Sequence, residues 1–280
     1  MRGIKDSARA LTAGTLFLGV ISLAAAGPAR AQGEKRTVFT EQDFHWQGHM
    51  KAGQTLEVIN QNGEIEGTAA SGDEARAEGM RRGNDDDREL YVEVVEYSDG
   101  VTICAVHAKD ATPGRCHRGG DSSWSESWGW GWRGRRAKIN FNLQVPRGVD
   151  FHALTTNGNV LGHNLQSVVE ATTTNGNVDV STGEWASATT TNGGIHVSMG
   201  SAKWTGELHV RTTNGSVEVT MPASAEFKVN AATTNGGIRT DFPITIQGMF
   251  SSKELSGTVG GGGRELRVVT TNGGIKLMKS

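Results

Sequence analysis

The sequence predicts an all-β protein that is built in its C-terminal half as a single-chain parallel β-solenoid. The tetrapeptide Thr-Thr-Asn-Gly occurs six times between residues 155 and 273. Apolar and polar residues alternate on both sides of each copy, which is the pattern of a strand with one buried face. The chain also has 39 glycines and many threonines, a composition that favours strands and tight turns over helices.

Residues 1–31 have the pattern of a signal peptide. Basic residues precede an apolar run from Ala10 to Gly27, and Ala29-Arg30-Ala31 offers small residues at the two positions that a signal peptidase reads. The alternative is an uncleaved membrane anchor, because the run is near the length that spans a bilayer. We expect cleavage after Ala31 and an exported protein, which is periplasmic, part of the cell envelope or secreted. Its mature form is not expected to span a membrane.

The charge balance disfavours a nucleic-acid binder. The whole chain has 28 basic and 30 acidic residues, and removal of residues 1–31 leaves 24 basic and 29 acidic residues, a formal net charge of −5. Domains that bind nucleic acids usually carry an excess of basic residues. The remaining length is sufficient for a large buried core in one or two domains.

After a polar leader at 32–49, one β-repeat domain is expected over 50–280, with regular repeats at 150–280. The segment Gln54–Gly67 alternates with period two around Asn62-Gly63. We interpret Asn62-Gly63 as a seventh, degenerate copy of the repeated corner.

Two excursions are expected to interrupt this domain, at 68–89 and at 105–136. The first is rich in charge and contains Asp85, Asp86 and Asp87. These residues lack the spacing and the closing glutamate of a calcium loop. The segment is therefore predicted to be a solvated loop, and the sequence indicates no metal site there.

Cys104 and Cys116 are the two cysteines of the chain. In an exported protein such a pair predicts a disulfide bond, which would contribute about 3 kcal/mol for a loop of this length. The alternatives are a metal pair and a redox thiol. They are disfavoured because there is no Cys-x-x-Cys, and because His107 and His117 lack regular ligand spacing.

The segment 123–136 combines tryptophans and arginines with serine and glycine. Glycine between large aromatic rings does not build a packed core, so some rings are expected to be exposed. Exposed aromatics with arginines are typical of a contact surface for sugars, lipid headgroups or a partner protein. The alternative is a low-complexity insertion without a ligand. The candidate binding loop consists of Trp124, Trp128, Trp130, Trp132, Arg133, Arg135 and Arg136.

The repeats specify their inward positions and leave their outward positions free. Consecutive corner asparagines are 18, 17, 22, 21 and 37 residues apart, and the positions four before, three after and five after each of them are mostly apolar. These positions share one face of a strand and are expected to point inward. The position four after the asparagine changes chemistry in every copy. The expected corner ladder is Asn62, Asn157, Asn175, Asn192, Asn214, Asn235 and Asn272.

Two geometries fit this pattern. In an antiparallel β-meander or sandwich, each Asn-Gly forms a hairpin turn with positive φ. In a parallel solenoid, equivalent residues of neighbouring coils lie about 4.8 Å apart, so that Asn amides and Thr hydroxyls can form ladders. The repeated threonines favour the solenoid, because a hairpin has no need of them. Fixed-period repeats are typical of such architectures.

The chain resembles the putative-adhesin family of exported bacterial β-repeat proteins, a family of unknown function. The matching stretches are "GQTLEVINQNGEIEG", "VPRGVDFHALTTNGNV" and "LSGTVGGGGRELRVVTTNGGIKL". With the repeats between them, the resemblance covers roughly residues 50–280. It implies an all-β repeat fold at the cell envelope and provides no catalytic motif.

The function predicted from the sequence is that of a non-enzymatic envelope protein, an adhesin or a structural scaffold. The first alternative is a glycan- or partner-binding module that uses the loop 123–136. The second is a polysaccharide-active enzyme, because parallel solenoids host such activities. However, its paired carboxylates are missing from both outward positions, and loss of activity in Glu170→Ala would be needed to support it.

The sequence indicates no catalytic residue, no cofactor and no metal. His152, His163, His196 and His209 form no spaced metal triad. Envelope glycans or proteins are the expected partners, and the oligomeric state is not specified. An open end of the solenoid at the last repeat would favour association with another copy.

Overall fold

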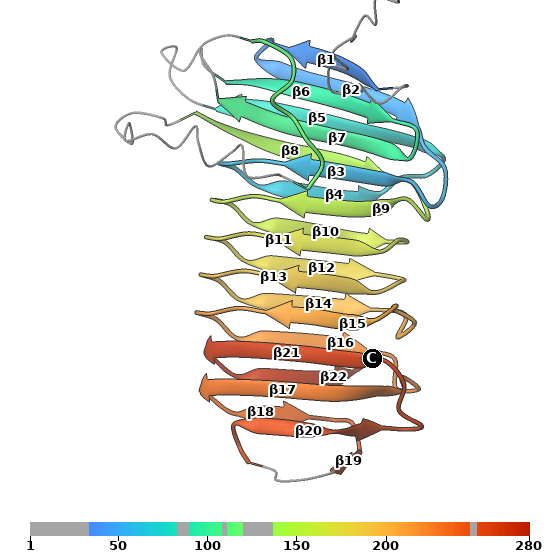
Figure 1. The fold of residues 1–280 in the computed structure, drawn as a ribbon, viewed down its shortest axis with the longest axis vertical. Coiled ribbons are helices and arrows are strands. Elements are labelled where there is room, and N and C mark those ends of the chain that lie inside the picture. Colours follow the sequence, from blue (N-terminus) through green and yellow to red (C-terminus); the bar gives the residue numbers. More distant parts are fainter. Residues whose placement is uncertain (1–33, 83–89, 108–110, 120–136, 247–250) are drawn as a thin grey trace, which may run out of the picture. The chain divides into compact units, whose positions relative to one another are not determined.

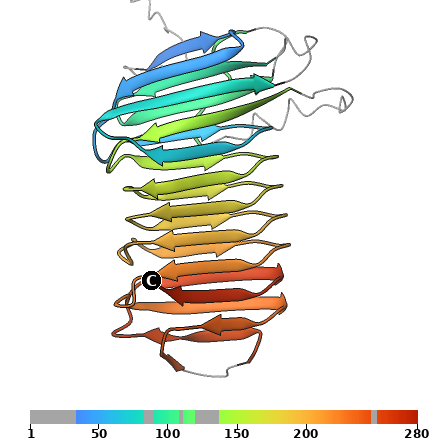
Figure 2. The same ribbon diagram turned by 180° about the vertical axis from the view of Figure 1, so that it is seen from behind.

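The computed structural model describes residues 34–82, 90–107, 111–119, 137–246 and 251–280, all within one compact unit, Gly33–Ser280. These residues form strands and loops, and the all-β fold class is confirmed for them. The strands belong to two sheets, mostly parallel within each sheet (Figures 1 and 2). The chain alternates between the sheets, so that one repeat adds one strand to each.

The first sheet, called sheet A, has twelve strands. In spatial order they are β1 (Lys35–Phe39), β6 (Leu90–Tyr97), β7 (Gly100–His107), β3 (Thr55–Ile59), β9 (Asp150–Leu154), β11 (Val169–Thr172), β13 (Ala186–Thr189), β15 (Glu207–Arg211), β21 (Glu265–Asn272), β17 (Phe227–Asn235), β20 (Glu254–Val259) and β19 (Ile244–Ile246).

The second sheet, called sheet B, has ten strands. In spatial order they are β18 (Ile238–Thr240), β22 (Ile275–Lys279), β16 (Val217–Met221), β14 (Ile195–Met199), β12 (Val178–Thr182), β10 (Val160–Leu165), β4 (Ile65–Ala69), β8 (Lys138–Val145), β5 (Glu74–Arg82) and β2 (Asp43–His49).

The repeats pair in parallel and in register. Val160 lies beside Val178, Val178 beside Ile195, and Ile195 beside Val217. The Asn-Gly corners are not hairpins: none of the corner asparagines has positive φ, and among the corner glycines only Gly63 does. For the regular repeats, this arrangement differs from the antiparallel meander that the sequence left open.

The inward positions of the repeats form the core between the two sheets. The residues three after each corner asparagine are buried except Ile238, which is half-buried, and those four before it are all buried. Large side chains fill the two ends, where the regular repeats stop; the largest fully buried ones include Phe44, Phe141, Trp204 and Phe227. Constant small and β-branched residues inside therefore allow each coil to pack on the next.

The spatial order of the coils differs from their order in the sequence. Strands β21 and β22, which carry the last repeat, lie between the coil of β15 and β16 and the coil of β17 and β18. The expectation that the last repeat forms an open end is therefore wrong. The strands at that end of the sheets are β19 and β18, and β19 and β20 pair antiparallel there.

The opposite end is also closed by antiparallel strands. β1 pairs with β6 and β6 with β7 in sheet A, while β2 pairs with β5 and β5 with β8 in sheet B. The segment expected as a polar leader thus contains strands β1 and β2, and the first expected excursion contains β5. Ala75, Ala77 and Gly79 supply the inward alternation of β5, but small residues among charges gave little hydrophobic contrast in the sequence.

Candidate functional site

The repeated corner has two sets of side-chain hydrogen bonds, one outside and one inside. Outside, each asparagine amide nitrogen donates to the side-chain oxygen of the asparagine in the neighbouring coil, at 2.7–2.8 Å. The resulting ladder runs Asn62, Asn157, Asn175, Asn192, Asn214, Asn272 and Asn235. The structure brings all seven expected asparagines together, with the last two in exchanged order.

Inside the corner, the first threonine of each Thr-Thr pair is buried. Its hydroxyl donates to a glycine carbonyl of the neighbouring coil, not to another threonine. The pairs are Thr155–Gly63, Thr173–Gly158, Thr190–Gly176, Thr212–Gly193, Thr270–Gly215 and Thr233–Gly273, at 2.8–3.2 Å. This contact satisfies a hydroxyl that would otherwise be costly to bury.

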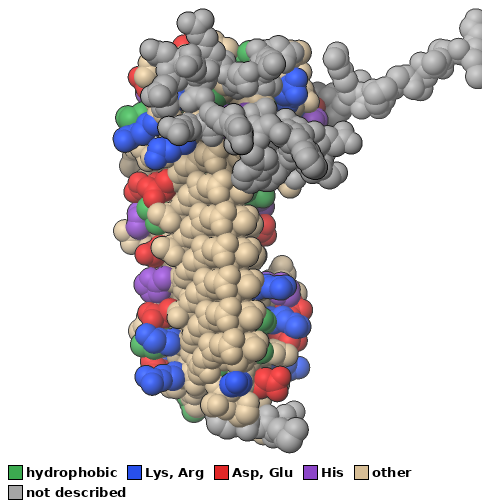
Figure 3. Space-filling model, turned by 90° about the vertical axis from the view of Figure 1, so that its left-hand side faces the viewer, with side chains coloured by type: hydrophobic (Ala, Val, Ile, Leu, Met, Phe, Trp, Pro, Cys, Tyr) green, Lys and Arg blue, Asp and Glu red, His purple; other side chains and the backbone are tan. Residues whose placement is uncertain are grey.

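The corner leaves an uncharged band along one side of the stack. Figure 3 shows this band of amide, hydroxyl and backbone atoms, with charged side chains on both sides of it. The charged side chains belong to the outward columns of the two sheets. The side chains best suited to bind a ligand on this part of the surface therefore lie in those columns.

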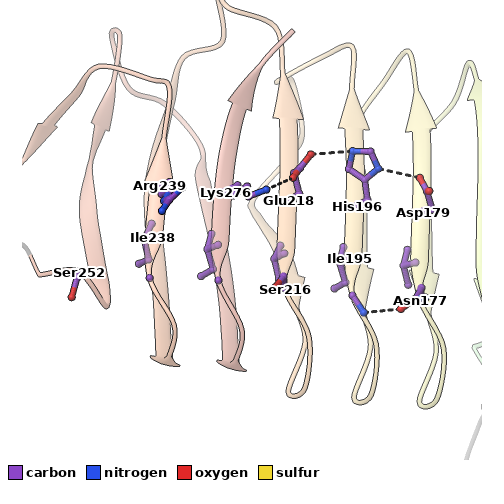
Figure 4. A pocket seen from close by; sticks show the side chains of 16 residues that line it. Asn177, Asp179, Ile195, His196, Ser216, Glu218, Ile238, Arg239, Ser252 and Lys276 are labelled. Atoms are coloured by element: carbon purple, nitrogen blue, oxygen red, sulfur yellow. Dashed lines mark hydrogen bonds and ion pairs between the residues drawn. The ribbon is translucent and has the colours of Figure 1, made fainter.

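A groove of about 740 Å³ lies on the outer face of sheet B, next to the corner (Figure 4). One wall is the column four residues after each corner asparagine, which contains Asp179, His196, Glu218, Lys276 and Arg239 in spatial order. The other is the column two residues after it, which contains Asn177, Gly194, Ser216, Gly274 and Gly237.

The charged column is a chain of ion pairs with one free end. His196 lies between two carboxylates, with Nδ1 3.4 Å from Asp179 Oδ1 and Nε2 3.5 Å from Glu218 Oε1. Lys276 Nζ donates to Glu218 Oε2 at 3.2 Å. Arg239, on edge strand β18, is exposed and has no ion pair with any residue that the structure describes. Positive charge therefore collects at the β22–β18 end of the groove.

The outward column of sheet A has weaker contacts. His152 Nε2 lies 3.9 Å from Glu170 Oε2, and Glu207 lies 3.8 Å from both His209 and Arg267. Burial is the main reason why the pKa of Asp150 is raised; His152 nearby lowers it and Glu170 raises it. Over both sheets, the described part of the chain holds no group of three or more His, Cys, Asp or Glu that could bind a metal.

A strap formed by residues 111–119 covers the outer face of sheet A at β3, β6 and β7. The disulfide Cys104–Cys116 holds it, as the sequence predicts. Glu93, fully buried, accepts hydrogen bonds from the backbone N–H groups of residues 114, 115 and 116 and from Arg36, at 2.6–3.0 Å. Glu57 accepts from Gly119 N–H at 3.0 Å and from the hydroxyl of Thr102 at 2.9 Å.

At the edge of the strap, Arg118 forms a two-point ion pair with Asp99, at 2.7 and 3.0 Å, and lies over the ring of Tyr97. The hydrogen bonds from Arg118 hold the pKa of Asp99 below its usual range. The described part of the strap extends to residue 119. The candidate binding loop 123–136 and the three aspartates 85–87 lie outside the described residues.

Sequence reasoning missed the groove and the strap. The signal for the groove was the change from asparagine at 159 and 177 to glycine at 194 in the column two after the corner. The signal for the strap was weaker, because Glu57 and Glu93 stand at alternating positions of strands that the sequence marks as exposed.

Comparisons with known proteins find a family match in the C-terminal half of the chain. A family model described as Toastrack DUF4097 matches residues 141–278. No curated protein sequence matches the chain significantly. In the described residues there is no helix with the length and apolar character needed to cross a membrane.

Three solved structures are similar to this chain. A putative cell adhesion protein from Clostridium sporogenes is 8% identical, with a TM-score of 0.49 over 85% of this chain and 100% of that chain. Putative adhesins from Bacteroides fragilis and Parabacteroides distasonis are 11% and 10% identical, with TM-scores of 0.30 and 0.29. The matches cover 86% and 84% of this chain and 98% and 96% of those chains.

Proposed function

We propose a function from the premise that residues 141–278 belong to the Toastrack DUF4097 family: the chain is a non-enzymatic envelope protein, an adhesin or scaffold built as a parallel β-solenoid. It is exported with the help of residues 1–31. Its stacked coils form a stiff support, and its outward columns are the surface offered to partners.

The observation that carries this proposal is the contrast between the two faces of each strand. Inward positions and corners repeat from coil to coil, whereas Asp179, His196, Glu218, Lys276 and Arg239 occupy one equivalent outward column. A fold that needs constant residues at its inward positions and tolerates varied residues at its outward positions can present different side chains to a binding partner. Such a surface can gain a binding specificity without change to its core.

The groove geometry also argues for binding rather than hydrolysis. Asp179 and Glu218 stand two strands apart, about 9.6 Å at the usual strand spacing. An inverting glycosidase needs room for a water molecule between its two carboxylates. The imidazole of His196 fills that room and contacts both carboxylates. The two carboxylates are therefore separated and positioned by the imidazole between them rather than arranged around a water molecule.

The test is a binding screen of the full chain against immobilised glycans and envelope fractions, combined with an assay for cleavage of the same polysaccharides. Binding without cleavage is the expected result. A variant with Trp124, Trp128, Trp130 and Trp132 changed to Ala shows whether the loop 123–136 contributes. Cleavage of a uronate polymer that is lost in Glu170→Ala or Glu218→Gln would overturn the proposal, as would recovery of the chain in the cytoplasm.

A further inference from the structure

We propose, as a refinement that rests on the function above, that the groove of sheet B binds the acidic groups of an extended anionic polysaccharide. The binding groups are the backbone N–H groups of Ser216, Gly274 and Gly237 together with the side chains of Lys276 and Arg239.

The first step is a second ladder that runs beside the asparagine corner. At the position two after the corner, in three steps of the stack, a side-chain oxygen of one coil accepts a hydrogen bond from the backbone N–H of the neighbouring coil. Asn140 Oδ1 accepts from Glu64, Asn159 Oδ1 from Asn177, and Asn177 Oδ1 from Gly194, at 2.8–3.2 Å. These N–H groups therefore point along the stack, toward the preceding coil.

The ladder stops at Gly194, because glycine has no side chain to continue it. Ser216 N–H faces Gly194, Gly274 N–H faces Ser216, and Gly237 N–H faces Gly274. None of these three groups has a hydrogen bond to a residue that the structure describes. The carbonyl oxygens of these three residues point the same way, but each of them accepts a hydrogen bond. The donors are the backbone N–H groups of Ile195 (to Ser216), Val217 (to Gly274) and Ile275 (to Gly237).

Two of the three donors face a glycine. A Cβ added at Gly194, which Ser216 N–H faces, would lie 3.5 Å from its nearest neighbour, and one added at Gly274, which Gly237 N–H faces, would lie 3.4 Å away. All three residues line the groove. The result is a row of three unused N–H donors, one per coil, in a surface hollow. Backbone donors of this kind form their strongest hydrogen bonds with anionic oxygens.

The charged column places cations beside the last two donors. Lys276 follows Gly274 by two residues, and Arg239 follows Gly237 by two (Figure 4). Lys276 is partly neutralised by Glu218, whereas Arg239 is free among the described residues. An Arg guanidinium matches carboxylate and sulfate oxygens with two parallel donors. At the other end of the groove, Asp179 and Glu218 offer acceptors for sugar hydroxyls.

The spacing of the donors favours a polysaccharide over a peptide. The donors repeat with the strand spacing, about 4.8 Å. An extended peptide presents carbonyl groups on one side at every second residue, about 6.7 Å apart. Its carbonyl spacing therefore does not match the spacing of the three N–H donors. A pyranose ring spans close to one strand spacing. The groove also runs across the strands, where a peptide cannot add to a sheet edge.

The test measures binding of the full chain to four probes. These are an oligogalacturonate, its methyl ester, a sulfated oligosaccharide and poly-glutamate. We expect binding to one or both acidic saccharides and binding at least about tenfold weaker to the ester. The double variant Lys276→Gln, Arg239→Gln should lose a similar factor. Lys228→Gln, Arg267→Gln, which removes the same charge from sheet A, should retain full affinity.

A second variant blocks one of the three donors, Ser216 N–H, without changing the charge. Gly194→Asn restores the acceptor found at Asn159 and Asn177, so it should fold at least as stably as the parent and bind the acidic saccharide more weakly. Full affinity in this variant would overturn the inference, and so would equal binding of the ester, tighter binding of poly-glutamate, or no binding of any acidic saccharide. If the chain then binds other envelope components without cleaving them, the proposed function still stands.

Discussion

At the scale of single residues, two adjacent glycines of one corner provide a sharp test of the stack. A Cβ at Gly193 would lie 1.9 Å from the carbonyl oxygen of Gly176, so that the coils would have to separate. A Cβ at Gly194 would lie 3.5 Å from its nearest neighbour, the carbonyl oxygen of Ser216, which is an ordinary contact distance. We expect Gly193→Ala to destabilise the fold by about 3 kcal/mol or more. Gly194→Ala should stabilise it by about 0.4–1 kcal/mol, because its backbone suits an L-residue. Urea unfolding of both variants measures these effects. Equal urea midpoints for Gly193→Ala and Gly194→Ala would contradict the close stacking of the corners.

The two threonines of each corner provide a second test at this scale. Thr190 is buried and donates to Gly176 O at 2.9 Å, while Thr191 is exposed. Thr190→Val should therefore cost about 1 kcal/mol for an unreplaced hydrogen bond, and Thr191→Val should cost less than about 0.5 kcal/mol. Both effects are read from thermal unfolding. A larger loss in Thr191→Val would show that the outer threonine is the structural one.

The sequence was a good guide at this scale wherever a residue type repeats. Buried Val178, Ile195 and Val217 and the stacked asparagines follow from the repeat and from the period of a strand. The role of the corner glycine followed in part. Glycine was expected where a side chain would obstruct the bend, and the structure shows that the obstructing neighbour is the backbone of the next coil. Two stacked backbones cannot be recognised from one copy of the motif.

At the scale of elements, the strap is held by a buried carboxylate as well as by the disulfide. Glu93 accepts four hydrogen bonds, three of them from consecutive strap residues. With the disulfide intact, Glu93→Gln should cost about 3 kcal/mol, because N–H donors and Arg36 then lose their charged acceptor. Glu96→Gln, which breaks the exposed pair with Lys35, should cost less than about 1 kcal/mol. Similar urea midpoints for the two variants would mean that the disulfide alone, and not Glu93, holds the strap in place.

Elements outside the regular repeats were the least predictable. Strands β1, β2 and β5 close one end of the sheets, and their segments look polar because each shows only one face to the core. In β5 the inward residues are small and the outward residues are charged, so the sequence lacks the hydrophobic alternation that predicts a strand. The groove was equally hidden, because it arises from what neighbouring coils lack, namely side chains at 194, 274 and 237.

At the scale of the whole molecule, the order of the coils is the feature that sequence reasoning could not supply. Each repeat presents similar backbone and corner residues to its neighbours, so the repeat pattern alone does not specify which coils are adjacent. The 37-residue gap before Asn272 is close to two repeat periods, but within it β19 (Ile244–Ile246) and β20 (Glu254–Val259) form the antiparallel end of sheet A. The chain thus turns back and inserts its final repeat. This places Lys276 between Glu218 and Arg239, and the groove depends on that order.

Cysteine pairs on the outer face of sheet A test this order directly. His209 and Arg267 are neighbours across β15 and β21, and Arg267 and Asn230 are neighbours across β21 and β17. Neighbouring parallel strands lie about 4.8 Å apart, within the Cα range of a disulfide, whereas His209 and Asn230 are then about 9.6 Å apart and beyond it. Oxidation should therefore join the pair His209→Cys, Arg267→Cys and the pair Asn230→Cys, Arg267→Cys, but not the pair His209→Cys, Asn230→Cys. Peptide mapping by mass spectrometry identifies each bond. A bond between 209 and 230 would mean that the coils follow the chain in sequence, and Lys276 would then lie outside Arg239 rather than beside Glu218.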